Sequence, residues 1–423
     1  MFQSQRLGSF LICLVLGFLA CVGDGGAGSG SGWEAAVDTV GDTVVVRTLS
    51  GSAWGDTASL EAEVSIGMLE GPDEYLIGSP RSIAVGAGGE IYVLDRQVPV
   101  IRMYDRDGAF IRNVGREGGG PGEYKSPGAI TVLPDNRLIV RDPGNGRVTT
   151  YSAGGEYLDQ VWYPGGFNTS RRMYTDTSGF AYSMVLLNYG TTPWEWIFGL
   201  ARIDPDEGIR DTIPSPTWDY VPPQITASRE ESSSSDNVPF SPEDHWTFSP
   251  LGYMIGALST DYRVDLYRVN EPVLRIERAW TPVPVQREEA DEQRRYATDN
   301  MQRQYSGWKW NGPGVPDTKP PFTNLLVSWE GNIWVQVSQE GYATMTESEA
   351  RTEEARSDRP QLRFTEPAAY DVFSPDGTYL GHVQTPRSFR ARPEPLVRGD
   401  NVWAVTRDEM DVARVVRFRI KKP

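Results

Sequence analysis

Residues 79–125 read SPRSIAVGAGGEIYVLDRQVPVIRMYDRDGAFIRNVGREGGGPGEYK, and residues 126–171 read SPGAITVLPDNRLIVRDPGNGRVTTYSAGGEYLDQVWYPGGFNTSR. Laid over each other without a gap, the two stretches share the opening Ser-Pro pair and an aspartate, which is Asp95 in the first and Asp142 in the second. The repeat period is 47 residues. Self-similarity at this kind of period is typical of folds that arrange copies of one small structural unit side by side.

Each copy contains four short β-like runs separated by turn residues. In the first copy the runs are SIAV, EIYVLD, VIRMY and AFIRNV, and the intervening GAGG and DRDG supply tight turns. The first two runs are the more apolar, whereas the later two alternate apolar with polar residues, as half-exposed strands do. A repeated four-stranded antiparallel unit of this size predicts an all-β fold, the β-propeller, in which each copy is one blade.

Divergent copies follow at residues 201–213, 246–278 and 325–383. The last copy supplies only three strands, so we expect a strand near the N-terminus, Thr43–Thr48, to pair beside Arg414–Ile420 and close the ring. Closure protects sheet edges that would otherwise be exposed. The sequence therefore predicts six blades; a seventh would have to lie inside an insertion.

The glycine-rich stretch GREGGGPGEYKSPGAI, residues 115–130, raises the alternative of a phosphate-binding loop. Its GPGEY has a counterpart, GPDEY, at residues 71–75, just before the first copy. Tyr124 also stands where the phosphate-loop pattern GxxxxGK[ST] requires glycine. The stretch is therefore predicted to be a connector between blades.

The connector IGMLEGPDEY (66–75) and the strand GEIYVLD (89–95) resemble those of NHL-type, TolB-like six-bladed propellers of the bacterial envelope. The resemblance covers residues 64–165. It implies the fold, and some propeller relatives are metal-dependent lyases or lactonases. Fold alone does not establish function.

The N-terminus has the features of a bacterial lipoprotein signal. Arg6 precedes the apolar run Leu7–Ala20, which as a helix would span roughly 21 Å, too short for a membrane crossing. Cys21 follows directly and leads into a Gly/Ser-rich spacer. We expect a signal peptide over 1–20, lipidation of Cys21 with a flexible tether over 21–36, and a single propeller domain over 37–423. Plain secretion is the alternative.

Composition limits the partners and locates the insertions. The net charge of −16 argues against binding to nucleic acid. Three segments exceed the repeat: residues 214–245 are predicted to be an exposed mobile loop, 286–305 the one short surface helix, and 339–368 a solvated loop or short helix. Long insertions often carry the binding function of a repeat scaffold.

Few residues suggest catalysis or metal binding. The only histidines are His245, expected in an insertion, and His382, expected on an outer strand, so a three-histidine zinc site is excluded. No GxSxG-type nucleophile is present. Asp95 and Asp142 recur with the repeat, which favours a structural role in turns. We expect no catalytic residue, metal ligand or cofactor; a His–carboxylate site, or Ca²⁺ held by Asp, Glu and Asn at the central channel, remain alternatives.

Two Trp-x-Trp pairs are the named binding candidates: Trp194, Trp196, Trp308 and Trp310. In an extended segment each pair places two indoles on one side of the chain. Buried, they would be core; exposed, they would form platforms for sugars or peptide side chains.

The sequence thus predicts an envelope-anchored propeller on the outer-membrane or periplasmic side, acting as a non-catalytic binding or scaffold module for a protein, peptide or glycan. The alternative is a metal-dependent propeller hydrolase or lyase, lactonase-like, with a divalent ion at the central channel. A purely structural role in an envelope assembly is a third possibility.

Overall fold

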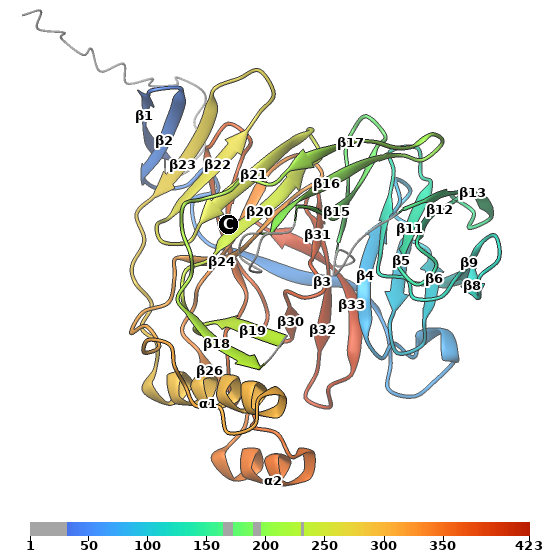
Figure 1. The fold of residues 1–423 in the computed structure, drawn as a ribbon. Helices are drawn as coiled ribbons and strands as arrows, with labels where there is room; N and C mark the ends of the chain where they lie inside the picture. Colours follow the sequence, from blue (N-terminus) through green and yellow to red (C-terminus); the bar gives the residue numbers. More distant parts are fainter. Residues whose placement is uncertain (1–31, 164–171, 189–195, 230–231) are drawn as a thin grey trace, which may run out of the picture. The chain divides into compact units, whose positions relative to one another are not determined.

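The computed structural model describes residues 32–163, 172–188, 196–229 and 232–423. Almost all regular structure in these ranges is β-strand, accompanied by two α-helices and the 3-10 helix η1 (Asp73–Tyr75) (Figure 1). No helix in the described ranges combines the length and apolar character needed to cross a membrane. The predicted signal peptide and Cys21 lie outside the described residues.

Three four-stranded antiparallel sheets follow one another along the chain, each with its strands in sequence order. Unit I consists of β4 (Pro80–Val85), β5 (Ile91–Asp95), β6 (Val100–Tyr104) and β7 (Phe110–Val114). Unit II consists of β10 (Ala129–Val132), β11 (Leu138–Asp142), β12 (Arg147–Tyr151) and β13 (Tyr157–Trp162). Unit III consists of β14 (Met173–Thr175), β15 (Ala181–Asn188), β16 (Ile197–Asp204) and β17 (Gly208–Pro214).

Two larger sheets contain the next three units. Unit IV is β20 (Asp244–Ser249), β21 (Tyr253–Leu258), β22 (Arg263–Tyr267) and β23 (Val273–Arg278), extended by the hairpin β1 (Glu34–Val40) and β2 (Thr43–Ser50). Unit V is β24 (Phe322–Val327), β25 (Ile333–Val337), β28 (Ala369–Phe373) and β29 (Tyr379–Gln384). Unit VI is β31 (Leu396–Arg398), β32 (Asn401–Arg407), β33 (Ala413–Lys421) and β3 (Ala58–Ile66), with β30 (Phe389–Arg390) also on β32.

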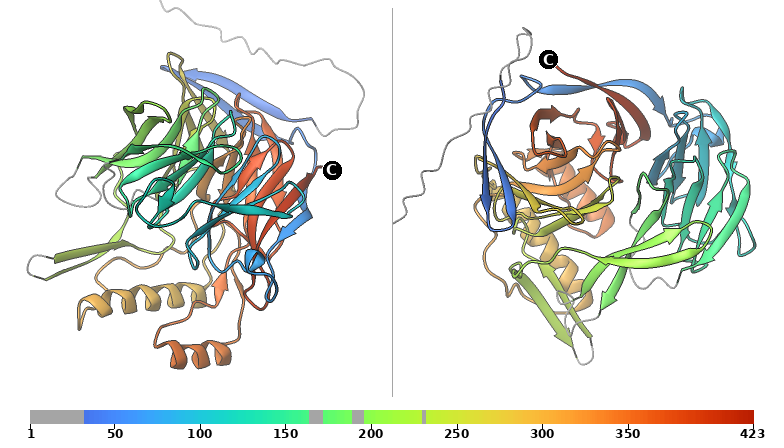
Figure 2. Two further views of the ribbon diagram at one scale, coloured as in Figure 1. Left: turned by 90° about the vertical axis from the view of Figure 1, so that its right-hand side faces the viewer. Right: turned by 90° about the horizontal axis from the view of Figure 1, so that it is seen from above.

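The units are arranged around a common centre (Figure 2), and buried apolar clusters lie between neighbouring units. Between units I and II the cluster includes Leu94 and Val140, both fully buried. Corresponding clusters lie between II and III, III and IV, IV and V, and V and VI. Units VI and I share a cluster that includes Ile66, Val93 and Trp403. Each unit therefore packs on two neighbours, and the last unit packs on the first.

The expected closing strand is wrong. Thr43–Ser50 forms a hairpin with β1 and pairs in parallel with β23 of unit IV. The strand that pairs antiparallel with β33 is β3, Ala58–Ile66. The physical reason is connectivity, because β3 leads through a short connector directly into unit I, whereas β2 lies before a turn that carries the chain away from unit IV.

The glycine-rich stretch is a connector, as predicted. Its main-chain carbonyls accept hydrogen bonds from the protein's own side chains: Arg147 donates to Gly120 O (2.6 Å) and Tyr151 to Gly122 O (3.1 Å). Gly122 has φ of +70°, and a Cβ there would lie 2.9 Å from the Cβ of Tyr157. Only glycine fits this turn without strain.

The two repeated aspartates have the structural role that their period suggested. Asp95 accepts hydrogen bonds from the main-chain N–H groups of Gly78 (2.9 Å) and Ser79 (3.0 Å) in the preceding connector. Asp142 does the same for Lys125 and Ser126, at 2.9 and 2.8 Å. Each aspartate also accepts a hydrogen bond from a main-chain N–H group in the turn that follows it. It therefore links the connector before its unit to the turn after the unit's second strand.

The insertions differ in part from expectation. The segment predicted to be a mobile loop contains a hairpin of β18 (Gln224–Arg229) and β19 (Ser232–Asn237). The expected helix is α1 (Arg287–Gln304). A second helix, α2 (Glu347–Ser357), forms in 339–368, the segment predicted to be a solvated loop or short helix, so the insertions contain two helices rather than one. Short pairs also form between β26 (Tyr342–Ala343) and β27 (Phe364–Thr365), and between β8 (Arg116–Glu117) and β9 (Glu123–Tyr124).

Candidate binding site in the central channel

The first strands of the six units line a central cavity of about 130 Å³. Neighbouring first strands contact one another: Ser82 Oγ donates to Ile130 O (3.4 Å) between units I and II, and Trp329 N donates to Val397 O (2.9 Å) between units V and VI. The walls combine polar and charged groups with an apolar part made of Ile83, Ile130, Val132, Met173, Phe248 and Val327. Charged groups in such a cavity interact more strongly than they would in water.

An ion pair between Arg172 and Glu394 lies in this cavity. Arg172 immediately precedes β14, and its guanidinium carbon lies 4.4 Å from the ring centre of Tyr174. Glu394 stands between Pro393 and Pro395, just before β31. The flanking prolines fix their own φ angles and stiffen the backbone that presents the carboxylate. The Arg172 and Glu394 side chains are 27% and 21% exposed respectively, but Oε1 of Glu394 is itself buried.

Burial raises the pKa of the Glu394 carboxyl, and the nearby Arg172 and Arg392 guanidinium groups lower it in part. His245 lies close to Arg392, and burial together with that positive charge lowers the pKa of the imidazole to about 4. Desolvation thus favours the neutral form of both groups.

Two further arginines line the cavity. Arg81 Nε donates to Gly128 O (3.0 Å), and Arg398 lies over Trp329, with 4.8 Å from the guanidinium carbon to the ring centre. Three arginines and one glutamate therefore line the cavity, in a chain whose net charge is −16. An arginine-rich lining suits an anionic ligand.

The insertions cover the end of the ring at which the first strands begin. We call β18–β19, α1, β26–β27 and α2 the appendage; they lie together beyond one end of the sheets (Figures 1 and 2). Each inserted element lies in the chain either just before the first strand of a unit or between its second and third strands. Because neighbouring strands are antiparallel, the start of the first strand and the end of the second lie at the same end of the sheet. Arg81, Arg172 and Glu394 also lie at or before the starts of their strands, so the cavity's ion pair is near the appendage-bearing face.

A buried charged group holds the appendage together. Lys319 is fully buried, and its Nζ donates to Glu289 Oε1 (2.7 Å), Glu366 Oε1 (2.8 Å) and Gln339 O (3.2 Å). A separate apolar cluster of Ile225, Ala227, Val238 and Met301 packs the hairpin on α1.

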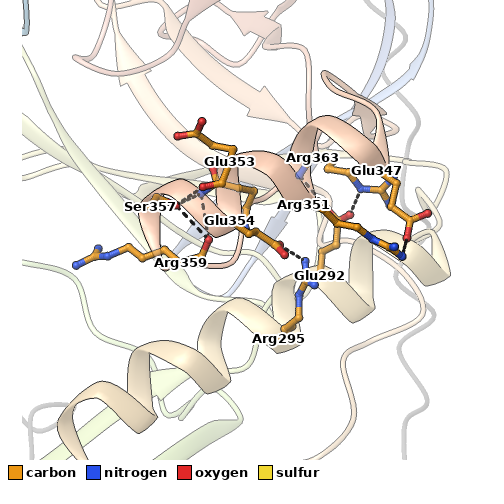
Figure 3. Close-up of polar contacts among 10 residues, drawn as sticks. Glu292, Arg295, Glu347, Arg351, Glu353, Glu354, Ser357, Arg359 and Arg363 are labelled. Atoms are coloured by element: carbon orange, nitrogen blue, oxygen red, sulfur yellow. Dashed lines mark hydrogen bonds and ion pairs between the residues drawn. The ribbon is translucent and has the colours of Figure 1, made fainter.

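Ion pairs also connect the two helices, as Figure 3 shows. Arg295 on α1 pairs with Glu354 on α2 (2.7 Å), and the main-chain N–H of Arg363 donates to Glu292 Oε2 (2.9 Å). Within α2, Glu347 pairs with Arg351, and both side chains are largely exposed. The appendage is thus an ordered structure, with its charges largely paired within it.

The predicted tryptophans lie apart from the cavity's ion pair. Trp308 and Trp310 are half-buried against the hairpin–α1 cluster, and their indole N–H groups donate to Thr226 O (2.8 Å) and Gly312 O (2.9 Å). Trp196 is half-buried, 6.4 Å from the ring of Phe198. Trp194 lies outside the described residues. Their binding role remains a prediction.

The histidines differ in their surroundings. His245 is on β20, the first strand of unit IV, and not in an insertion as predicted. His382 is on β29, and its Nδ1 lies 3.0 Å from Oδ1 of the buried Asp371, which also accepts from Tyr262 and Tyr379. Among the described residues, no group of three His, Cys, Asp or Glu side chains is placed to hold a metal ion.

Sequence reasoning missed Arg172, Glu394, Arg81 and Arg398. These residues come from three units, with Glu394 and Arg398 both in unit VI, and they share no local motif, so their convergence depends on ring closure. The one local signal is Pro-Glu-Pro at 393–395, a stiff segment that presents an acidic side chain.

Residues 57–195 match a domain family described as a 6-bladed beta-propeller. No curated protein sequence matches the chain. A member of the duf4221 family from Bacteroides vulgatus is similar in structure, with a TM-score of 0.51, 10% identity, and coverage of 87% of this chain and 99% of that one. At this identity the likeness concerns the fold alone.

Two further solved structures are similar at lower scores. A protein named as exported, from Bacteroides fragilis, has a TM-score of 0.44 and 13% identity, covering 86% of this chain and 96% of that one. Virginiamycin B lyase from Staphylococcus aureus has a TM-score of 0.39 and 9% identity, covering 84% and 99%.

Proposed function

We propose that this chain is a non-catalytic binding module of the bacterial cell envelope. In this proposal it is a six-bladed propeller of the NHL or TolB-like kind, lipid-anchored through Cys21 on the outer-membrane or periplasmic side. Its appendage-bearing face binds a protein, peptide or glycan. The observation that carries the proposal is the arginine-lined cavity near that face, in a chain that is otherwise strongly acidic.

The architecture supports binding at this face. A ring of packed sheets is a rigid support, and the insertions add an ordered wall beside the opening. Small-molecule and peptide sites in proteins usually combine apolar walls with a few placed polar groups, and the cavity has both. Trp308 and Trp310, which pack against the hairpin and α1 of the appendage, remain candidates for contacts with the outer part of a ligand.

The test is a binding screen with the soluble domain, residues 33–423, against peptide and glycan arrays. We expect ligands whose binding is lost in Arg81→Gln, which alters the cavity. Binding should be kept in Arg112→Gln. Arg112 is on the outer strand of unit I, and the change removes its exposed ion pair with Glu156. A domain that binds neither class, or hits that ignore Arg81→Gln, would contradict the proposal.

Native mass spectrometry with elemental analysis, on protein purified without chelator, addresses the enzymatic alternative. A stoichiometric divalent ion that resists dialysis, together with hydrolysis of a lactone, would replace the binding proposal by the metal-dependent hydrolase or lyase.

The anchor is tested on the full chain in a bacterial host. We expect metabolic labelling with a fatty acid and recovery in the membrane fraction, both lost in Cys21→Ser. A Cys21→Ser protein that still carries label, or a wild-type protein without it, would contradict lipidation.

A further inference from the structure

The carboxylate of Glu394 occupies a place that a ligand could take. It pairs with Arg172 inside the cavity and comes from a different unit, 222 positions later in the chain. A guanidinium group presents a planar fork that suits a carboxylate, and Arg172 is held in place by stacking on Tyr174. The cavity therefore already demonstrates that a carboxylate fits against Arg172.

Resting on the proposed function, we propose that the channel binds a carboxylate on a short apolar stem, and that Glu394 holds the place of this carboxylate on Arg172 in the free protein. The ligand's carboxylate then displaces the Glu394 side chain. A free short-chain acid and the acidic end of a peptide share this chemistry.

The size and lining of the cavity define the stem. A volume of about 130 Å³ is below the ~300–1,000 Å³ of sites that enclose a whole drug-sized ligand. It is close to the ~150 Å³ of an apolar cavity that holds benzene. The apolar walls suit a stem of a few carbons, and the rest of a larger ligand would lie outside, beside the appendage.

Charge balance allows the exchange. With the ligand in place, two carboxylates would share a cavity with Arg172 and Arg398. Arg392 lies near enough to Glu394 to act on its ionisation, and it offers the displaced carboxylate another cation. A displaced Glu394 is therefore not left as an unpaired buried charge.

The proposal predicts an unusual effect of removing the acidic side chain. Glu394→Gln removes the competing negative charge while keeping the shape, so it should bind butyrate about tenfold more tightly than wild type, since a charge-assisted pair contributes about 1.5 kcal/mol. Arg172→Gln should not bind butyrate. Butyramide, the neutral isostere, should bind neither wild type nor Glu394→Gln. Isothermal titration calorimetry on residues 33–423 measures each affinity.

Controls separate binding from folding. Glu347→Gln removes the carboxylate of an exposed Arg–Glu pair on α2 and should leave butyrate affinity unchanged. Circular dichroism checks each variant's fold, and Arg172→Lys serves if Arg172→Gln does not fold; it keeps the charge, loses the planar fork and should weaken binding. Glu394→Gln that is folded and binds butyrate no more tightly than wild type would overturn the proposal.

A second probe identifies the source of the carboxylate. A hexapeptide ending in glutamate that binds Glu394→Gln more tightly than butyrate does would indicate a peptide ligand, and weaker binding would indicate a free acid. If butyrate binds Glu394→Gln no more tightly than it binds wild type, while peptide or glycan array binding is intact, this inference alone would be rejected. If Glu394→Gln binds butyrate more tightly but the arrays yield no ligand, the envelope-ligand function would be rejected and the carboxylate site kept.

Discussion

The channel and the appendage use charged residues in opposite ways. In the appendage the buried Lys319 is surrounded by two glutamates, and the exposed arginines of the helices pair with neighbouring acids. In the channel, Arg81, Arg172 and Arg398 line a cavity together with one glutamate. Charges paired within a packed wall indicate a structural role, whereas several arginines beside an open volume indicate a place for a ligand.

The largest expected effect is in the appendage. Lys319→Met leaves the buried Glu289 and the half-buried Glu366 without their cation, and removing one partner of a buried pair such as Lys319–Glu289 destabilises proteins by about 3–5 kcal/mol. Denaturant unfolding measures the loss, with the exposed Lys309→Met as the matched control. An unchanged free energy of unfolding would show that these charges do not hold the appendage.

The next effect is on β20, the first strand of unit IV, and depends on pH. The pKa of His245 is lowered to about 4 from 6.5, so the unfolded chain binds the proton more readily between these values. Stability should therefore rise by about 3 kcal/mol as pH increases from 4 to 6.5, at 1.36 kcal/mol per pKa unit. His245→Phe should remove this rise. Unfolding curves across this range that are parallel for the two proteins would contradict the assignment.

A smaller pH effect of opposite sign is expected from Glu394. Its pKa is raised above 4.5, so the folded state binds the proton more readily, and stability from this group falls as pH increases from about 4.5 through the raised pKa. Subtracting the Glu394→Gln profile from that of wild type isolates this term from His245. A difference profile that is flat above pH 4.5, or that rises, would show that Glu394 is not desolvated in the channel.

The smallest effect is at the appendage surface. Glu347→Gln removes an exposed i,i+4 pair with Arg351, and such pairs contribute less than about 0.5 kcal/mol. Thermal unfolding should leave the midpoint nearly unchanged. A large loss of stability would mean that the exposed and buried charges of the appendage do not differ as we describe.

The regular part of the fold could be predicted because it repeats. The strands expected in residues 79–171 have counterparts in units I and II. The recurrence of Asp95 and Asp142 correctly indicated that they accept hydrogen bonds from main-chain N–H groups of turns. The prediction of the closing strand was wrong. Thr43–Thr48 is the more apolar and β-branched run, while Ala58–Ile66 contains glutamates between its apolar residues. Local propensity could not outweigh the connection of β3 to unit I.

The site could not be predicted because it exists only after the ring forms. Arg172 and Glu394 meet across units III and VI, and neither lies in a recognisable motif. The second helix had a readable signal: Thr346 and Glu349 form a capping box at the start of α2, a pattern visible as T-x-x-E. That signal concerns the appendage and does not indicate the channel.

The most direct test is a crystal structure of the soluble domain soaked with butyrate. We predict the butyrate carboxylate on the guanidinium of Arg172, its stem against the apolar wall, and the Glu394 side chain turned away. Glu394 still paired with Arg172 in a cavity without butyrate would contradict the account.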